Sequence, residues 1–275
     1  MKPRKFDLVR AETTAEALAA LSEAGGEAKI FAGGQSLMAM MNLRLLDPSV
    51  LIDISRTAEL SYIKEVGDKL EIGAATTQVE LLSWPGLADR LPLLHQAIPH
   101  LGHFQTRNRG TICGSLAHSD PSSELPLCLT TLGGEVVLKS TRGERVLSAA
   151  DFQLGMMTTA RTDDELIVAA RYPFKKPGEG FAFTEVAQRR GDFAIVAVAA
   201  VANGNTTRLG VGGVADKPTV KCWTNPVDEN LDEELNALAW ELKGSDDIHA
   251  TARYRRELVR RLGRRVIEEA NSCRS

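Results

Sequence analysis

The sequence has few cysteines and none in a metal-binding arrangement. Its 275 residues contain four, at positions 113, 128, 222 and 273. No pair has the C-x-x-C spacing of zinc and iron–sulfur sites, and so wide a scatter is untypical of a disulfide framework. His100 and His103 form an H-x-x-H pair but have no acidic or cysteine partner at metal-binding spacing. We therefore expect no metal site.

Long apolar runs and a basic excess are also missing. No run reaches the roughly 18 apolar residues of a membrane span, and residues 1–9 show no apolar signal core. Together with the scattered cysteines, this predicts a protein of the reducing cytoplasm. The formal net charge of −3 gives no support to nucleic-acid binding. The locally basic stretch 253–265 alternates with apolar residues and predicts a solvated amphipathic helix.

The first 56 residues have the pattern of a βαβ unit. Thr13 and Glu16 have capping-box spacing and predict a helix that ends at two glycines, residues 25–26. A second helix is expected to begin at Ser36 and to run to about residue 46, where Asp-Pro stops it. Strands are expected at residues 6–9, 29–32 and 50–54.

From Leu60 the pattern changes to a hairpin and several short helices. Gly67 and Asp68 separate two β-like runs, as in a β-hairpin of residues 62–66 and 69–73. Helices are expected from Thr77, over residues 91–100 and from Ser123, with a long loop at 109–123 and a strand at 135–139.

Two prolines and two glycines within residues 172–180 predict a domain boundary. Beyond it, strands are expected at 181–187, 194–202 and 207–215, followed by helices at 232–243 and 248–270. The chain is thus expected to be α+β, with domains at 1–176 (subdomains of about 1–56 and 57–176) and 177–275.

Residues 32–36, AGGQS, form a glycine turn between a strand and a helix. Glycines here let the backbone come close to phosphate oxygens, and the first amides of a helix favour anions. The stretch is neither G-x-G-x-x-G nor a Walker loop. A tight turn without a ligand is the alternative.

The second glycine-containing stretch, residues 109–124, is rich in hydroxyl groups, including those of Thr111 and Ser115. Two anion-friendly stretches in one chain indicate a ligand with two or more phosphates, held from both sides. The carboxylate of Asp120 does not suit a phosphate, but it suits a ribose hydroxyl or a flavin N–H as an acceptor.

Three stretches of the sequence resemble one family. FAGGQSLMAMMNLR (31–44) and RNRGTICGSLAHSDPSSELP (107–126) are similar to the two FAD-binding stretches of the medium subunits of molybdenum hydroxylases. This is the family of carbon monoxide dehydrogenase and xanthine dehydrogenase. RRGDFAIV (189–196) matches a third stretch. The resemblance covers essentially the whole chain, in the same order and at similar spacings.

The resemblance implies a fold and a cofactor site. The fold is a two-subdomain FAD-binding domain of the vanillyl-alcohol-oxidase type, followed by a smaller C-terminal α/β domain. The implied FAD contacts are to the pyrophosphate from two sides, to the adenosine or ribitol part by Asp120, and to the isoalloxazine ring. One side of the pyrophosphate would be bound by Ala32, Gly33, Gly34, Gln35 and Ser36, and the other side by Thr111, Gly114 and Ser115. Asp120 would lie near the adenosine or ribitol part. Asp192 and Phe193 would lie near the isoalloxazine ring.

The resemblance also implies an oxidoreductase subunit without catalytic residues of its own. Its FAD would take electrons from the [2Fe–2S] clusters of a small subunit and pass them to an outside acceptor. A large molybdenum-carrying subunit would act on the substrate, in a dimer of heterotrimers. Two alternatives remain open: a stand-alone flavin oxidase of the same fold, and a non-redox subunit that binds a nucleotide.

Cys113 stands where the resembled family usually has glycine. A side chain there is costly only if the backbone has positive φ, by about 1 kcal/mol. FAD in this family is generally non-covalent, and we expect no bond between the thiol and the flavin.

Overall fold

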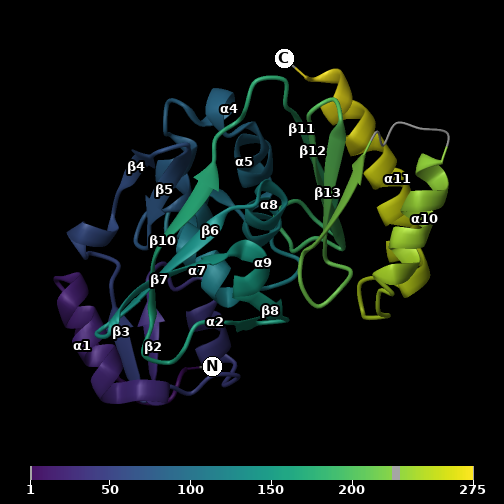
Figure 1. Cartoon of the computed structure of the whole chain (residues 1–275). Coiled ribbons are helices and arrows are strands. Elements are labelled where there is room, and N and C mark those ends of the chain that lie inside the picture. The colour runs from purple at the N-terminus through teal and green to yellow at the C-terminus, as the bar shows by residue number, and fades with distance from the viewer. Residues whose placement is uncertain (1, 225–229, 275) are drawn as a thin grey trace.

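The computed structural model of the chain describes residues 2–224 and 230–274. Helices and strands are mixed throughout this part, as expected. Three larger sheets follow one another along the chain, from the purple N-terminal end to the green C-terminal one (Figure 1). A small two-stranded sheet is formed by β8 (Gln153–Gly155) and β9 (Thr158–Thr159).

The first sheet is parallel, with the order β1-β3-β2. These strands are Asp7–Arg10, Val50–Asp53 and Ala28–Phe31. Helix α1 (Thr14–Ala24) connects β1 to β2, and the hydroxyl of Thr13 accepts a hydrogen bond from the Glu16 amide at 3.2 Å. Because parallel strands end at the same edge, the glycine turn after β2 lies beside the ends of β1 and β3.

Helix α2 (Leu37–Asn42) is shorter than expected. Ser36 has helical backbone angles itself and makes no capping bond with its side chain, so it does not act as the predicted cap. Arg44 has a φ of 59°, and this left-handed residue ends the helical turn before the Asp-Pro pair is reached.

The second sheet is antiparallel, with the order β4-β5-β10-β6-β7. These strands are Ile63–Val66, Lys69–Gly73, Leu166–Pro173, Glu135–Ser140 and Gly143–Ser148. The predicted hairpin is present, with Gly67 at a φ of 61° in its turn. The sequence pattern missed β7 because this edge strand is largely exposed and shows no alternation of buried and exposed side chains.

Short helices surround this sheet. They are α3 (Gln78–Leu82), α4 (Leu87–Arg90), α5 (Pro92–Ala97), α6 (Phe104–Arg107), α7 (Ile112–His118), α8 (Glu124–Leu132) and α9 (Ala149–Phe152). Helix α7 corrects the prediction of a loop over residues 109–123. The side chain of Thr111 caps it by accepting a hydrogen bond from the Gly114 amide at 2.9 Å.

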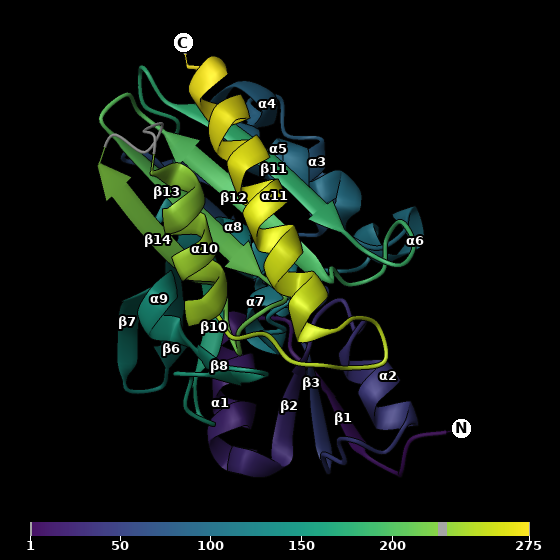
Figure 2. The ribbon, with the colours of Figure 1, turned by 90° about the vertical axis from the view of Figure 1, so that its right-hand side faces the viewer.

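The third sheet is antiparallel, with the order β11-β12-β13-β14. These strands are Gly180–Val186, Val196–Ala202, Thr206–Gly212 and Thr219–Thr224. Helices α10 (Leu231–Glu241) and α11 (Ala252–Ser272) cover one face (Figure 2), and α5 and α8 pack on the other. Short turns join consecutive strands, so they pair antiparallel. This part is therefore α+β rather than the predicted α/β.

Candidate functional site

A cavity of about 770 Å³ lies where the first sheet, the second sheet and the C-terminal part meet. Its walls include three separate stretches, around residues 29–37, 110–124 and 191–193, together with residues from other parts of the chain. The volume falls within the ~300–1,000 Å³ typical of small-molecule and cofactor sites.

The structure brings ten of the eleven predicted site residues to this cavity. The ten are Ala32, Gly33, Gly34, Gln35, Ser36, Thr111, Gly114, Ser115, Asp192 and Phe193. The exception is Asp120, which is not part of the lining. Its carboxylate accepts a hydrogen bond from the Ser122 amide at 2.8 Å and so shapes the turn before α8. The structure thus gives Asp120 a local role, and its predicted ligand contact stays a prediction.

Glycine is required at the two glycine positions of the first stretch for different structural reasons. A Cβ on Gly33 would lie 2.1 Å from the Arg109 carbonyl oxygen, so the first stretch packs backbone to backbone against the second. Gly34 has a φ of 69°, and a Cβ there would lie 2.4 Å from the ring of Phe31. The side chain of Gln35 donates back to the Gly33 carbonyl at 3.0 Å.

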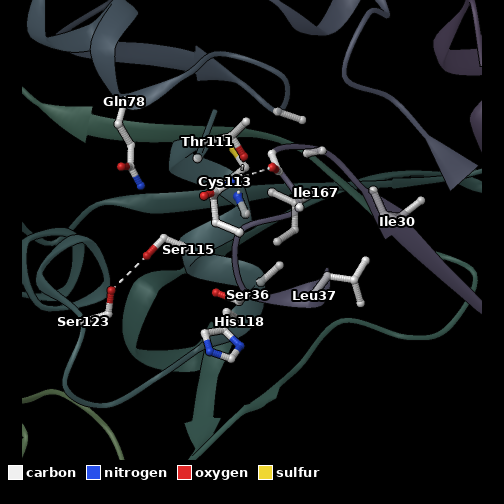
Figure 3. Close-up of a pocket in the computed structure, with 18 of the residues that line it drawn as sticks. Ile30, Ser36, Leu37, Gln78, Thr111, Cys113, Ser115, His118, Ser123 and Ile167 are labelled. Carbon is white, nitrogen blue, oxygen red and sulfur yellow. Dashed lines mark hydrogen bonds between the residues drawn. The ribbon is translucent and has the colours of Figure 1, made fainter. Parts of the chain in front are cut away.

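The second stretch presents the start of α7 to the cavity. The hydroxyl of Ser115 is hydrogen-bonded to that of Ser123 at 2.9 Å, which links α7 to the beginning of α8 (Figure 3). A Cβ on Gly114 would lie 2.7 Å from the capping oxygen of Thr111. Glycine at this position therefore leaves the cap undisturbed and the backbone open on the cavity side.

The third stretch comes from the C-terminal part. Gly191 has a φ of 89°, and a Cβ on it would lie 2.8 Å from the Gly102 carbonyl oxygen. The Arg189 guanidinium donates to Asp192 at 3.0 Å and lowers the pKa of that carboxyl. Phe193 lines the cavity although 55% of it is exposed, so it stands at the cavity mouth.

The carboxyl groups of the lining carry little uncompensated negative charge at neutral pH. Glu165 forms two hydrogen bonds with Arg145, at 2.6 and 2.8 Å, which lower its pKa to about 2. Glu124 is buried, and burial followed by the charge of Glu185 raises its pKa to about 8. Glu124 is therefore mainly protonated at pH 7. The cations Lys29 and Arg161 also belong to the lining, which suits a ligand with phosphate groups.

Other residues line the cavity without having been predicted from the sequence, and Glu124 and Gln78 are two of them. Glu124 lies within the second motif, so its place in that motif was the available signal. Gln78 belongs to neither glycine stretch. It reaches the cavity because its backbone amide donates to the Gly110 carbonyl oxygen at 2.8 Å. This contact joins distant parts of the chain, so no local sequence pattern predicts it.

The described ranges, 2–224 and 230–274, contain neither a cluster of metal ligands nor a membrane-spanning helix. Within them, no three His, Cys, Asp or Glu side chains are grouped so as to hold a metal ion. His100 instead lies 3.2 Å from a carboxylate oxygen of Glu185. No helix in these ranges has the length and apolarity needed to cross a membrane.

Comparison with known proteins gives the chain a family. Residues 4–175 match the family described as the FAD binding domain in molybdopterin dehydrogenase. The chain belongs to this family. The nicotine 6-hydroxylase medium subunit of Paenarthrobacter nicotinovorans is 37% identical, over 90% of both chains. The carbon monoxide dehydrogenase medium chain of Afipia carboxidovorans is 31% identical, over 99% of both.

A solved structure of the same family has the same fold over the entire chain. It is carbon monoxide dehydrogenase from Hydrogenophaga pseudoflava, in a form that lacks the Mo-pyranopterin moiety of its molybdenum cofactor. The match has a TM-score of 0.93 at 31% identity and covers 100% of both chains. This chain is therefore the FAD-binding medium subunit of a molybdenum hydroxylase, and an oxidoreductase subunit.

The cavity fits the FAD of this medium subunit. It is large enough, it lies between two glycine stretches, and its carboxyl groups are paired or protonated, so a diphosphate meets no unpaired negative charge. It also contains a buried amide oxygen, that of Gln78, without a partner among the described residues.

Cys113 is accommodated without strain in this FAD-binding domain. It lies within α7, and it is not among the described non-glycine residues that have positive φ. The cysteine therefore costs little where the family usually has glycine. Its sulfur lies 3.7 Å from the Ile72 carbonyl oxygen, and burial raises the pKa of the thiol to about 12. A buried, protonated thiol is a poor nucleophile, which argues against a covalent flavin bond.

Proposed function

We propose that this medium subunit carries electrons from the [2Fe–2S] clusters of a small partner subunit, through one FAD, to an external acceptor. The convergence of the three predicted stretches on one cavity supports this proposal more than any other observation. In the proposed complex, a large molybdopterin-binding subunit oxidises the substrate. The whole assembly is a dimer of heterotrimers in the cytoplasm.

The proposed site assigns a task to each wall of the cavity. The backbone of residues 32–36 and the start of α7, with the hydroxyls of Thr111 and Ser115, hold the pyrophosphate from two sides. Asp192 and Phe193 border the isoalloxazine ring. The flavin, when bound, accepts electrons singly and releases them singly or in pairs; the protein supplies position and electrostatics.

The mouth of the cavity supports transfer to and from other proteins. Phe193 lines the cavity with 55% of its surface exposed. Aromatic side chains are enriched at protein–protein interfaces, so an exposed phenylalanine at the opening supports docking of a partner there. We infer that the [2Fe–2S] partner docks beside this opening, where electrons have the shortest path to the flavin.

The domain organisation is part of the same proposal. We propose an FAD-binding domain at residues 1–176, of the vanillyl-alcohol-oxidase type, with subdomains at about 1–56 and 57–176. The C-terminal flavoprotein domain is 177–275. The successive sheets support this division, because the first uses strands up to Asp53, the second strands up to Pro173, and the third strands from Gly180 onward.

A pair of glycine variants tests the FAD site. Gly34→Ala introduces a Cβ that meets the Phe31 ring and displaces the first stretch. We therefore expect FAD affinity to fall about tenfold or more, where each tenfold loss corresponds to about 1.4 kcal/mol of binding free energy. Gly67→Ala is the matched control. Its φ of 61° imposes a similar backbone cost, about 1–2 kcal/mol, but its Cβ meets nothing within 4 Å.

Titration of the flavin-free protein with FAD, followed by flavin fluorescence, measures both affinities. Unfolding curves show how far each variant is destabilised. Equal FAD affinity in Gly34→Ala and Gly67→Ala, at similar stability, would remove the first stretch from the site. Failure of the unaltered chain to bind FAD would overturn the proposed function itself.

A further inference from the structure

The side-chain amide oxygen of Gln78 is buried at the cavity and has no partner among the described residues. The residue is 5% exposed and lines the cavity. Seven buried side-chain nitrogen and oxygen atoms have no hydrogen-bond partner within the part of the chain that the structure describes. Among the seven residues concerned, only Gln78 belongs to the cavity lining. For Gln78 the atom concerned is the side-chain oxygen Oε1. A buried amide oxygen without a partner is unusual, because leaving its hydrogen bond unmade is unfavourable.

Hydrogen bonds on both sides of Gln78 fix its backbone, which limits how far its side-chain amide can turn away from the cavity. Thr77 and Glu80 form a complete capping box at the start of α3, directly beside Gln78. Thr77 also forms a β-bridge with Thr111, and the backbone N–H of Gln78 donates to the carbonyl oxygen of Gly110, at the start of the second stretch. Figure 3 shows the side-chain amide of Gln78 extending toward the cavity.

A series of close contacts connects Gln78 with the segment that carries Asp192 and Phe193. A Cβ on Gly110 would lie 3.1 Å from the Gln78 amide nitrogen and 2.9 Å from the Thr106 carbonyl oxygen. A Cβ on Gly102 would lie 3.0 Å from Thr106.

Gly102 in turn lies against Gly191, next to Asp192 and Phe193. A Cβ on Gly191 would lie 2.8 Å from the Gly102 carbonyl oxygen. These contacts form one continuous wall from Gln78 to the third stretch. Ile30, which also lines the cavity, lies across from Gln78 on the other side of Thr111 and Cys113 in Figure 3.

We propose that the Gln78 amide hydrogen-bonds the imide edge of the isoalloxazine ring and raises the reduction potential of the bound FAD. This inference rests on the proposed function, since it takes FAD as the ligand. A primary amide offers an acceptor oxygen and two N–H donors. The ring edge offers an N–H group flanked by two carbonyl oxygens, which is the complementary pattern.

The sign of the effect on the potential follows from charge. Reduction adds electrons to the ring and makes its carbonyl oxygens stronger acceptors. A hydrogen bond from the Gln78 N–H to such an oxygen is therefore stronger in the reduced state than in the oxidised state. The protein then binds reduced FAD more tightly than it otherwise would, which raises the potential.

The Gln78→Met variant removes the amide and keeps a side chain of similar length. The matched control is Gln153→Met, because Gln153 is also buried, at 1% exposed, but its amide donates to Pro126 and Thr130 away from the cavity. The potential is measured by reduction with dithionite against a reference dye. We expect Gln78→Met to lower it by about 30 mV, which corresponds to a tenfold change in the affinity ratio of the two-electron couple. We expect Gln153→Met to leave it unchanged.

A second measurement identifies the half of FAD that Gln78 contacts, and it remains informative if Gln78→Met binds FAD too weakly for potentiometry. We expect Gln78→Met to weaken binding of FAD but to leave binding of ADP as in the unaltered protein. Equal loss for both ligands would place Gln78 at the adenine half and overturn the proposal. An unchanged potential with full FAD binding would overturn it as well. If the unaltered chain binds no FAD, the proposed function fails instead, which is a distinct result.

Discussion

Glu124 shows how the surroundings of a single residue set its charge. The carboxyl is 3% exposed, and burial raises its pKa from about 4.5 to about 8, with a further contribution from the charge of Glu185. Because it holds a proton at neutral pH, this carboxyl group can line the cavity that we propose for the diphosphate of FAD. A charged glutamate at the same place would repel the ligand.

This raised pKa predicts how stability depends on pH. Because the folded state holds the proton more tightly than the unfolded chain does, the stabilisation is complete below about pH 4.5 and is lost as the pH rises through about 8. We expect the flavin-free protein to lose stability from pH 5 to pH 8, and Glu124→Gln to reduce this loss. Urea unfolding at both pH values measures it.

Glu165→Gln serves as the comparison for that experiment. The pKa of Glu165 is about 2, so this group is already ionised in both folded and unfolded states above pH 5. Its replacement lowers stability overall but leaves the change from pH 5 to pH 8 as it was. If Glu124→Gln shows the same pH dependence as the unaltered protein, Glu124 does not hold its proton at pH 7.

At this scale the glycine stretches could be predicted from the sequence, whereas Gln78 could not. Gly33 and Gly34 stand together between a strand and a helix, and the requirement for a close approach or a positive φ is visible in the sequence. Gln78 is an ordinary residue at the start of a short helix. Its role depends on a contact with Gly110, about thirty residues away, which only the folded chain reveals.

At the scale of elements, Arg255 joins α11 to the third sheet. This arginine is 5% exposed, and it donates to the carbonyl oxygens of Ile195 and Gly213, both at 2.6 Å, and to Asp247. The Gly213 amide donates in turn to the Pro121 carbonyl oxygen at 2.8 Å. The last helix is thereby connected to the turn that precedes α8, beside the cavity.

We expect Arg255→Met to lower the free energy of unfolding by roughly 3 kcal/mol, because it leaves buried carbonyl groups and Asp247 without their partner. Thermal unfolding, compared with Arg261→Met, measures this. Arg261 is also in α11, but its side chain is 77% exposed and pairs with Glu257, so its replacement should change stability by only about 0.5 kcal/mol or less. Similar losses in both variants would contradict the role of Arg255.

Element prediction succeeded where one local signal decides the structure. The Thr13 cap, the Gly67 hairpin turn and the apolar spacing in α11 all produced the expected elements. It failed where two signals compete. The small residues and the glycine of residues 112–118 predict a loop, but the Thr111 cap favours a helix, and α7 forms.

At the scale of the whole molecule, segments far apart in the sequence contribute to one cavity. The proposed FAD cavity lies where the first sheet, the second sheet and the connection between β11 and β12 meet, with the exposed aromatic side chain of Phe193 at its mouth. This placement supports a subunit that receives electrons from one protein and releases them to another molecule.

The most direct test of this account is anaerobic electron transfer from the reduced iron–sulfur partner to this chain. The [2Fe–2S] subunit is reduced with dithionite, freed of excess reductant, and mixed with the FAD-loaded chain while the flavin absorbance is recorded. The account predicts that the flavin bands bleach, and that partner protein without its clusters leaves them unchanged. An oxidised flavin after mixing with the reduced partner, or bleaching of the isolated chain by an organic substrate alone, would contradict it.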